Sequence, residues 1–445
     1  MLVVVGLSPS CHRSTMPPRA DGAAVVLSPE VLDDGLQAVP EVEPNDTLAA
    51  AQRLALSPTT PVAVGASLVK SAAGAKRDVD WFRIDLPAPD GGAAPPVARA
   101  DAAGVLPVPL PRSLLRADLR PEAGVAVTLD AIDAGGHLLV SAPGQPGEAI
   151  AIPNLAIAPG PTYLRVRAAT AEATPGGYRL VVHLSAVDVG AEIEPNGSAT
   201  LATELLPGGE AVGYLGWRHD QDWYRLPTAG LAEGSFLSVD LDPVPGVGAA
   251  LQLYGADTHK LIEARGRKGE RVVLRDVRFP AGDAQVYLVV RADSDWSADA
   301  RYNVRPRADL PKPGAEAEPN DDPGHAQTVG DGVVIGYLGR GDVDVFRYVT
   351  EAPAVLEVEL SPPEHANVKL EILRADGTLL TRSEGGKHGA IRIADLAIPG
   401  GPVFIRLAGG RGSANADDPY HLNISSHPGG PAAEPAPKEA PPKVE

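Results

Sequence analysis

Side chains that carry hard oxygen donors recur in one short phrase at three places in this 445-residue chain. The phrase reads EVEPNDT at 41–47, EIEPNGS at 192–198 and EAEPNDD at 316–322. A pair of aspartates two residues apart follows each phrase, in DVDWFRI, DQDWYRL and DVDVFRY. Calcium prefers six to eight oxygen ligands with tolerant geometry, so these residue types point to a calcium site. The candidate ligands are Glu41, Glu43, Asn45, Asp46, Asp78, Asp80, Glu316, Glu318, Asn320, Asp321, Asp342 and Asp344, with Glu192, Glu194, Asn196, Asp220 and Asp222 as a weaker set.

The spacing within the phrase favours convergence of its oxygens. Glu41, Glu43 and Asn45 are two residues apart, so an extended segment places all three on one side. Pro44 biases the residue before it toward extended backbone. The phrase therefore predicts a short extended segment with one acidic face.

The aspartate pair that follows would complete the site. Asp78 and Asp80 also share one side of a strand start. Carboxylates brought this close repel one another and their pKa values rise, unless a cation relieves the repulsion. Gly197 stands in the second copy where the other copies have aspartate, so we expect that copy to bind more weakly or not at all.

Other interpretations of the same residues remain open. The glutamates suit solvated charges that protect a strand edge. Asn45 and Asp46 suit the cap of a short helix, and the aspartate pair suits a backbone turn. Zinc is disfavoured because no cluster of histidine and cysteine accompanies the acids.

The acidic phrase opens a long repeat. After it, each copy has a glycine-containing apolar strand, the aspartate-pair strand, further alternating strands and a closing strand with a tyrosine: Tyr178, Tyr302 or Tyr420. The copies span about 41–186, 191–308 and 315–427, and the first carries a Pro/Ala-rich loop insertion at about 88–112.

Period-two alternation of apolar residues between Gly/Pro turns predicts half-buried strands. In SFLSVDLDP, for example, Leu237, Val239 and Leu241 share one face. The sequence thus predicts an all-β chain of three tandem antiparallel β-sandwich (jelly-roll-like) domains. The one helical candidate is TLAAAQRLAL at 47–56, with Asp46 or Thr47 as its N-cap.

The order of these motifs resembles the bacterial pre-peptidase C-terminal (PPC) domain family, in three tandem copies. The resemblance rests on E-x-E-P-N-D, a G-x-L strand, D-x-D-W-F and a closing Y-x-L strand. It implies a compact β-sandwich that accompanies secreted hydrolases as an accessory module. In some relatives the acidic phrase and the later aspartates bind calcium. No peptidase motif accompanies the modules in this sequence, so we do not expect a proteolytic role.

The net charge and the absence of catalytic motifs argue against several classes of function. A formal net charge of −18 leaves no basic stripe for nucleic acid. The sequence contains no GxSxG, HExxH or P-loop motif, so we do not expect an enzyme. Trp81 and Trp223 follow the aspartate pair and could stack on a sugar, but packing on neighbouring residues is the more frequent use of such residues.

The N-terminus suggests export. The apolar residues of MLVVVGLSPS precede Cys11, the chain's single cysteine. This resembles a lipoprotein signal at 1–11 with Cys11 lipidated, although a random apolar N-terminus with a free thiol fits too. Residues 12–40 would be a linker and 428–445 a disordered Pro-rich tail.

Together these features predict a non-catalytic exported lipoprotein, lipid-anchored at the cell envelope or secreted. We expect a monomer whose modules bind a protein or glycan ligand and are stabilised by calcium. The alternative is an accessory or maturation factor for a separately encoded secreted peptidase.

Overall fold

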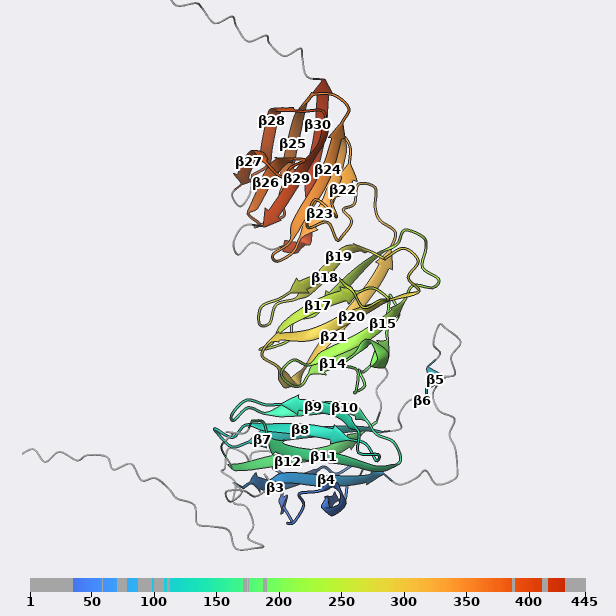
Figure 1. Ribbon diagram of the computed structural model, residues 1–445, viewed down its shortest axis with the longest axis vertical. Coiled ribbons are helices and arrows are strands. Elements are labelled where there is room, and N and C mark those ends of the chain that lie inside the picture. The colour runs from blue at the N-terminus through green and yellow to red at the C-terminus, as the bar shows by residue number, and fades with distance from the viewer. Residues whose placement is uncertain are drawn as a thin grey trace, which may run out of the picture. The chain divides into compact units, whose positions relative to one another are not determined.

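The structure of the protein is a computed structural model. The structure describes residues 35–57, 59–69, 78–86, 98–99, 108–109, 113–170, 174, 176–186, 190–385, 389–409 and 415–428. Within them nearly every regular element is a strand (Figure 1). Most strands assemble into six sheets of four or five strands. This confirms the predicted all-β fold of repeated sandwiches. The predicted signal with Cys11, most of the linker and nearly all of the tail lie outside the described residues.

Sandwich 1 consists of two five-stranded sheets. One has the order β1 (Ala38–Pro40), β3 (Val62–Leu68), β12 (Gly176–Ser185), β7 (Leu114–Pro121) and β10 (Ile150–Ala156). The other has the order β2 (Gln52–Leu54), β4 (Val79–Leu86), β11 (Gly160–Ala168), β8 (Val127–Ile132) and β9 (Leu138–Pro143).

Sandwich 2 repeats this plan without a counterpart of β1. One sheet has the order β14 (Ala211–Leu215), β21 (Ser297–Asp309), β16 (Phe236–Leu241) and β19 (Val272–Arg278). The other has the order β13 (Thr203–Glu204), β15 (Gln221–Pro227), β20 (Gln285–Ser294), β17 (Gly248–Tyr254) and β18 (Lys260–Arg265).

Sandwich 3 matches sandwich 2 strand for strand. One sheet has the order β23 (Gly332–Leu338), β30 (Asn415–Pro428), β25 (Ala354–Ser361) and β28 (Ile391–Ile398). The other has the order β22 (Gln327–Val329), β24 (Val343–Thr350), β29 (Gly401–Gly409), β26 (Val368–Arg374) and β27 (Leu379–Gly385).

The strands form where apolar residues alternate. In β25, Ala354, Leu356, Val358 and Leu360 are buried while their neighbours face outward. Residues of both sheets contribute to one largely aliphatic core in sandwich 2 and to another in sandwich 3. Phe82, Leu129 and Leu180 are fully buried in sandwich 1. Each core follows from the period-two pattern, since one face of each sheet must leave water.

Two local predictions need correction. The segment 47–56 is not an α-helix: it forms one 3-10 turn, η2 (Leu48–Ala50), and then β2. Thr47 is the N-cap, as expected, and its hydroxyl accepts a hydrogen bond from the Ala50 N–H. Pairing of β2 with β4 stabilises this segment more than a short isolated helix would. In the insertion at 88–112, the described residues form a strand pair, β5 (Ala98–Arg99) and β6 (Val108–Pro109).

The chain divides into two compact units. One contains the described residues within 1–88, 117–149 and 159–183, and the other those within 89–116, 150–158 and 184–445. Sandwiches 2 and 3 therefore lie in one unit, together with β10. Among the described residues, none of the helices has the length and apolar character needed to cross a membrane.

Candidate metal centre

Three acidic clusters form where each acidic phrase meets its aspartate pair. The short strand after the phrase runs parallel to the strand that contains the second aspartate of the pair: β2 with β4, β13 with β15 and β22 with β24. Cluster 1 comprises Glu41, Glu43, Asn45, Asp78 and Asp80; cluster 2 Glu192, Glu194, Asn196, Asp220 and Asp222; cluster 3 Glu316, Glu318, Asn320, Asp342 and Asp344.

The same backbone bond joins phrase and pair in every copy. The carbonyl of Asn45 accepts the N–H of Trp81, the residue after the second aspartate, at 3.1 Å. The equivalent bonds are Trp223 to Asn196 at 3.1 Å and Val345 to Asn320 at 3.0 Å. The asparagine is therefore held beside the second aspartate of the pair.

Carboxylate oxygens converge within each cluster. One ligand oxygen from each of three acids lies within 4.8 Å of the others, and the three acids come from both the phrase and the pair in every copy. These triplets are Glu41, Glu43 and Asp80; Glu194, Asp220 and Asp222; and Glu316, Glu318 and Asp344. The predicted meeting of phrase and pair is thus present in all three sandwiches.

Hydrogen bonds inside the cluster orient the asparagine. Its backbone N–H donates to the second glutamate of the phrase, for example Asn320 to Glu318 Oε2 at 2.7 Å. Its side-chain Nδ2 donates to the first glutamate in clusters 1 and 3, Asn45 to Glu41 at 3.1 Å and Asn320 to Glu316 at 2.8 Å. The amide oxygen Oδ1 is left for another partner.

Several oxygens in these clusters are buried without a hydrogen-bond partner. Oδ1 of the asparagine is unpartnered in all three copies, at Asn45, Asn196 and Asn320. These asparagines are fully buried. Unpartnered carboxylate oxygens also occur in each cluster: Asp80 Oδ1, Glu194 Oε1, Asp220 Oδ1, Asp222 Oδ1, and Asp344 Oδ1 and Oδ2. A buried acceptor without a partner is costly, and this one recurs in all three copies.

The first aspartate of each pair also closes a turn. Asp220 Oδ2 accepts the Gly216 N–H at 2.7 Å, and Asp342 Oδ2 accepts the Gly339 N–H at 2.9 Å. Asp78 accepts the Val69 N–H in the same way. The turn interpretation of the pair is thus correct for its first member. The second member, Asp80, Asp222 or Asp344, is fully buried in the cluster.

A tyrosine also belongs to each cluster, a role that the sequence did not predict. Tyr302 donates to Asp222 Oδ2 at 2.8 Å, Tyr178 to Asp80 Oδ2 at 2.5 Å, and Tyr420 to Glu316 Oε1 at 3.2 Å. All three rings are buried. The closing-strand tyrosine served only as a marker of the repeat. The sequence feature that could have indicated its role is that, among the closing-strand residues, only the tyrosine is the same in every copy.

Glycine makes room for this tyrosine in two of the copies. A Cβ at Gly213 would lie 2.4 Å from Tyr302 Oη and 2.5 Å from Glu192 Oε2. At Gly336 it would lie 2.1 Å from Glu316 Oε2. Ala66 is paired with Tyr178 at the corresponding position of sandwich 1. Clusters 2 and 3 are therefore packed more tightly around their first glutamate.

The electrostatics show the cost of gathering these charges. Burial and then the Glu41 charge raise the pKa of Asp80 to about 10. Burial and the Asp342 and Glu316 charges raise the pKa of Glu318 to about 10, and burial and the Asp342 charge raise that of Glu316 to about 7. In cluster 2, burial raises the pKa of Asp222 to about 6 and drives that of Glu194 well above its ordinary value.

Buried acids elsewhere in the chain are neutralised differently. Asp130 is fully buried but bonds to Arg165 and Arg167, at 2.6 and 2.8 Å. Despite the opposing effect of burial, these arginines and Ser141 lower the pKa of Asp130. In the described part of the chain, no ion pair joins a carboxylate of cluster 2 or 3 to lysine or arginine. These clusters therefore lack the counter-charge that buried acids normally require.

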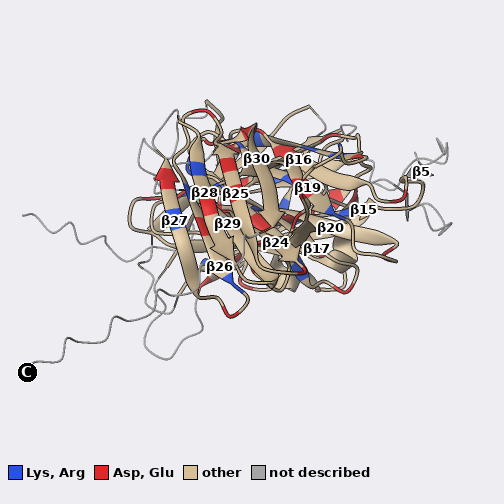
Figure 2. Ribbon diagram, turned by 90° about the horizontal axis from the view of Figure 1, so that it is seen from above, with Lys and Arg blue, Asp and Glu red and all other residues tan. Residues whose placement is uncertain are grey.

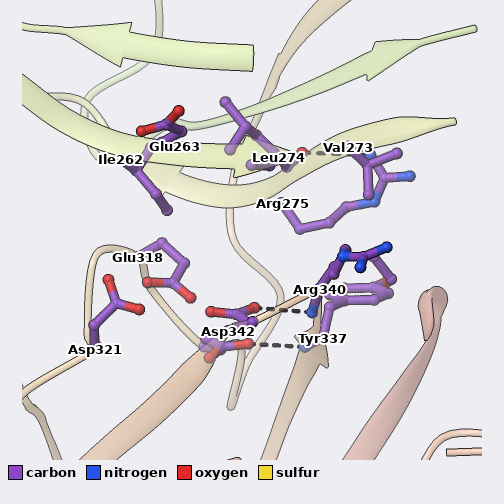
Figure 3. Close-up of a pocket in the computed structure, with 15 residues that line it drawn as sticks. Ile262, Glu263, Val273, Leu274, Arg275, Glu318, Asp321, Tyr337, Arg340 and Asp342 are labelled. Carbon is purple, nitrogen blue, oxygen red and sulfur yellow. Dashed lines mark hydrogen bonds between the residues drawn. The ribbon is translucent and has the colours of Figure 1, made fainter. Parts of the chain in front are cut away.

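The last acid of the phrase lies outside these close groups. Asp46 and Asp321 are both exposed. Asp46 Oδ1 accepts the Val79 N–H at 3.4 Å. Asp321 instead lines a cavity of about 110 Å³, together with Glu318 and Asp342 on one wall and Leu274 and Arg275 on the other (Figure 3). Cluster 3 thus opens toward a small polar cavity.

The two tryptophans pack on aromatic side chains from other strands of their own sheets. Trp81 meets Tyr163 edge-on, with ring centroids 6.3 Å apart, and Arg165 lies 5.2 Å from its ring. Trp223 stacks on Tyr254 at 4.9 Å. Both are therefore engaged within their own sheet.

Acidic and basic positions are interspersed over β25, β28 and β29 (Figure 2).

No family model matches the chain, and no curated protein matches it. Solved structures match distantly. A protein of Eubacterium rectale described as secreted is 7% identical over 52% of this chain and 81% of its own, with a TM-score of 0.18. The PBSX exported protein XepA is 9% identical over 57% and 88%, with a TM-score of 0.19. A triple jelly-roll protein of an archaeal virus is 9% identical over 72% and 80%, with a TM-score of 0.18. Similarities this low carry no functional conclusion.

Proposed function

We propose that each sandwich binds one calcium ion in its acidic cluster, as a structural ion. The observation that carries this proposal is the buried asparagine Oδ1 without a partner, repeated at Asn45, Asn196 and Asn320 beside unpartnered carboxylate oxygens. All of these donors are hard oxygens, the ligand type that calcium takes in numbers of six to eight. The motif resemblance to PPC domains supports the same ion.

The donor set explains what the ion would do. It would neutralise carboxylates such as Asp222 and Asp344, which are fully buried. It would also hold the acidic phrase against the aspartate-pair strand, to which the phrase is otherwise joined by few bonds. Magnesium suits the clusters less, because it demands near-ideal octahedral geometry and keeps several of its waters.

The same glutamates connect the ion to the junctions between repeats. The backbone of Glu318 bonds to Asp276 and Arg278 of β19, at 3.0 and 2.9 Å. The backbone of Glu194 bonds to Asn154 and Ala156 of β10, at 3.0 and 2.8 Å. A calcium ion on the side chain would therefore stiffen the segment through which one repeat contacts the next.

At the level of the whole protein, we propose a non-catalytic, exported lipoprotein whose calcium-stabilised modules bind a protein or glycan ligand at the cell envelope. The apolar stretch before Cys11 and the strongly acidic composition support export. The motif order supports an accessory rather than a catalytic module.

The test is metal content and thermal stability of the full chain with Cys11→Ser, which prevents lipidation and disulfide-linked dimers. Elemental analysis after gel filtration in calcium should give three ions per chain. Asp80→Asn, Asp222→Asn and Asp344→Asn should each remove one ion. At about 1 mM calcium and a Kd of about 10⁻⁴ M, each site should add about 1.4 kcal/mol of stability.

Asp130→Asn is the matched control, because Asp130 is equally buried but paired with arginines. It should lower stability and leave three ions bound. A chain that melts identically in calcium and in chelator, and that elutes without calcium, would rule the proposal out.

A further inference from the structure

The repeats contact each other through one recurring backbone contact. Each of the three sandwiches has an edge strand with one residue in the left-handed region: Asn154 in β10 at φ 50°, Asp276 in β19 at φ 46° and Asp395 in β28 at φ 54°. We call these residues and the two that follow them the acceptor segments, 154–156, 276–278 and 395–397.

Two acceptor segments are filled by the acidic phrase of the next repeat. Asn154 O accepts the Glu194 N–H, and the Ala156 N–H donates to Glu194 O. The same pairing occurs at both junctions, as a parallel bridge between Leu155 and Glu194 and another between Val277 and Glu318. The second contact is completed by Arg278 Nη2, which donates to Ala317 O at 3.2 Å. At each junction, one residue of the next repeat thus pairs alongside an edge strand, which is a short form of strand addition.

The third acceptor segment has no such partner in the described chain. β28 is the edge of its sheet, and its inner side pairs with β25, with Val355 opposite Ala397. That register matches Phe236 opposite Arg278 in sandwich 2, so the Ala397 N–H faces outward as that of Arg278 does. Leu396 is half-buried, whereas its counterparts Leu155 and Val277 are fully buried.

The first acidic phrase is the counterpart of the two phrases that dock on acceptor segments, and we call it the donor surface. In the described residues, no hydrogen bond reaches the backbone N–H or carbonyl of Glu43, the counterpart of Glu194 and Glu318. Val42 is 59% exposed, while its counterpart Ala317 is 3% exposed. The phrase is nonetheless held as in the other copies, since Glu41 N–H bonds to Gly65 O and Asn45 O accepts from Trp81.

We propose that this chain associates head to tail, with the phrase around Glu43 of one copy docked on residues 395–397 of a second copy. The contact would repeat the two junctions already present inside the chain. Because donor and acceptor are different surfaces, the contact is heterologous and repeats into open filaments or closed rings. It would join the predicted monomers only at high local concentration, since so short a pairing is weak without a covalent linker.

The experiment uses the full chain with Cys11→Ser, in calcium, by sedimentation equilibrium up to about 1 mM, the range for weak contacts. Val42→Asp removes the donor surface, and Ala397→Pro removes the outward N–H at an edge where proline is tolerated. The wild-type mass should rise with concentration beyond the dimer. Each variant alone should stay at the monomer mass, and their equimolar mixture should stop at the dimer.

Leu379→Asp is the control, because Leu379 is an exposed leucine on β27 in the other sheet of sandwich 3. It should associate like the wild type. Leu396→Asp is a second acceptor variant if the melting curve shows that Ala397→Pro is unfolded. A wild type that remains monomeric throughout, or variants that associate as strongly as it does, would overturn the head-to-tail contact.

Discussion

In sandwich 1, Glu43 is exposed and Glu41 is half-buried, whereas in sandwich 3 the corresponding Glu318 and Glu316 are 5% and 2% exposed. The asparagine donates to both glutamates in each of the two clusters, while the tyrosine donates to Asp80 in the first and to Glu316 in the third. The difference in exposure comes from the surroundings. Residues of sandwich 2 line the cavity beside cluster 3.

This comparison separates the ligands from their environment. The motif places the same oxygens in both clusters, while the neighbouring repeat decides how far water is excluded from them. A charge costs more to bury than to leave exposed, and a cation bound there gains correspondingly. We therefore expect the two clusters to share a dependence on calcium and to differ in how strongly single residues contribute.

The largest expected effect tests what the clusters share. In sandwich 3 the pKa of Glu316 is raised to about 7 by burial and Asp342, and that of Asp342 to about 6 by burial. A raised pKa stabilises the fold below the unfolded value near 4, and that contribution is lost as the pH rises through about 6 to 7. In chelator, these two carboxyls alone should lower the unfolding free energy by about 4 kcal/mol between pH 5 and pH 8.

Calcium binds the ionised carboxylates, so it should reverse this loss. Urea unfolding in calcium and in chelator at both pH values measures the effect. The gain from calcium should be large at pH 8 and small at pH 5. Stability in chelator that stays level over this range would mean that the clusters carry no uncompensated charge.

The second effect tests the difference in burial. Because the pKa of Glu318 is raised to about 10, this carboxyl must take up a proton when the chain folds at pH 7.5, and glutamine need not. In chelator at pH 7.5, Glu318→Gln should therefore stabilise sandwich 3 by roughly 2 kcal/mol. Glu43→Gln changes an exposed residue and should stay within about 0.5 kcal/mol. Thermal melts in chelator compare the two variants directly. Equal effects would show that the exposure of Glu43 has no energetic consequence.

The third effect concerns the packing of the tyrosine. Gly336→Ala would place a methyl group on Glu316 and Tyr420, and such overpacking costs about 1–3 kcal/mol. Ala66→Gly in sandwich 1 should cost only about 0.5–1 kcal/mol, the entropy of glycine in a strand. Calcium-saturated melts of both variants check this. If Gly336→Ala is silent, cluster 3 is looser than its geometry indicates.

Much of this site could be predicted from local sequence. The spacing of Glu41, Glu43 and Asn45 placed their oxygens together because side chains alternate in extended backbone. The repeat itself indicated which aspartates belonged to each phrase. The helix predicted over 47–56 was wrong because alanine content favours a helix only weakly, while β2 gains a partner in β4.

The rest depends on tertiary contacts that no local pattern contains. A tyrosine in an apolar closing strand is equally typical of an ordinary core residue, so the bond from Tyr302 to Asp222 could not be read from its neighbours. The burial of Glu318 comes from β19, which precedes it by some 40 residues in a different repeat. The exposed place of Asp46 likewise became apparent only in the fold.

The smallest effect tests the predicted weakness of cluster 2. Gly197 faces open space, where an added Cβ would meet only Gln221 O at 3.7 Å. Gly197→Asp should therefore add an exposed carboxylate, like Asp46, rather than a buried ligand. Exposed charge pairs contribute about 0.2–1 kcal/mol, so calcium affinity should rise no more than about fivefold.

Calorimetric titration in an Asp80→Asn, Asp344→Asn background isolates cluster 2, and Asp46→Gly with cluster 1 intact is the reciprocal control. A modest gain in one and an equal modest loss in the other would mean that the last acid of the phrase acts through long-range charge. A gain beyond tenfold would make that aspartate a direct ligand. The three clusters would then differ in ligand count, and burial alone could not explain the contrast between them.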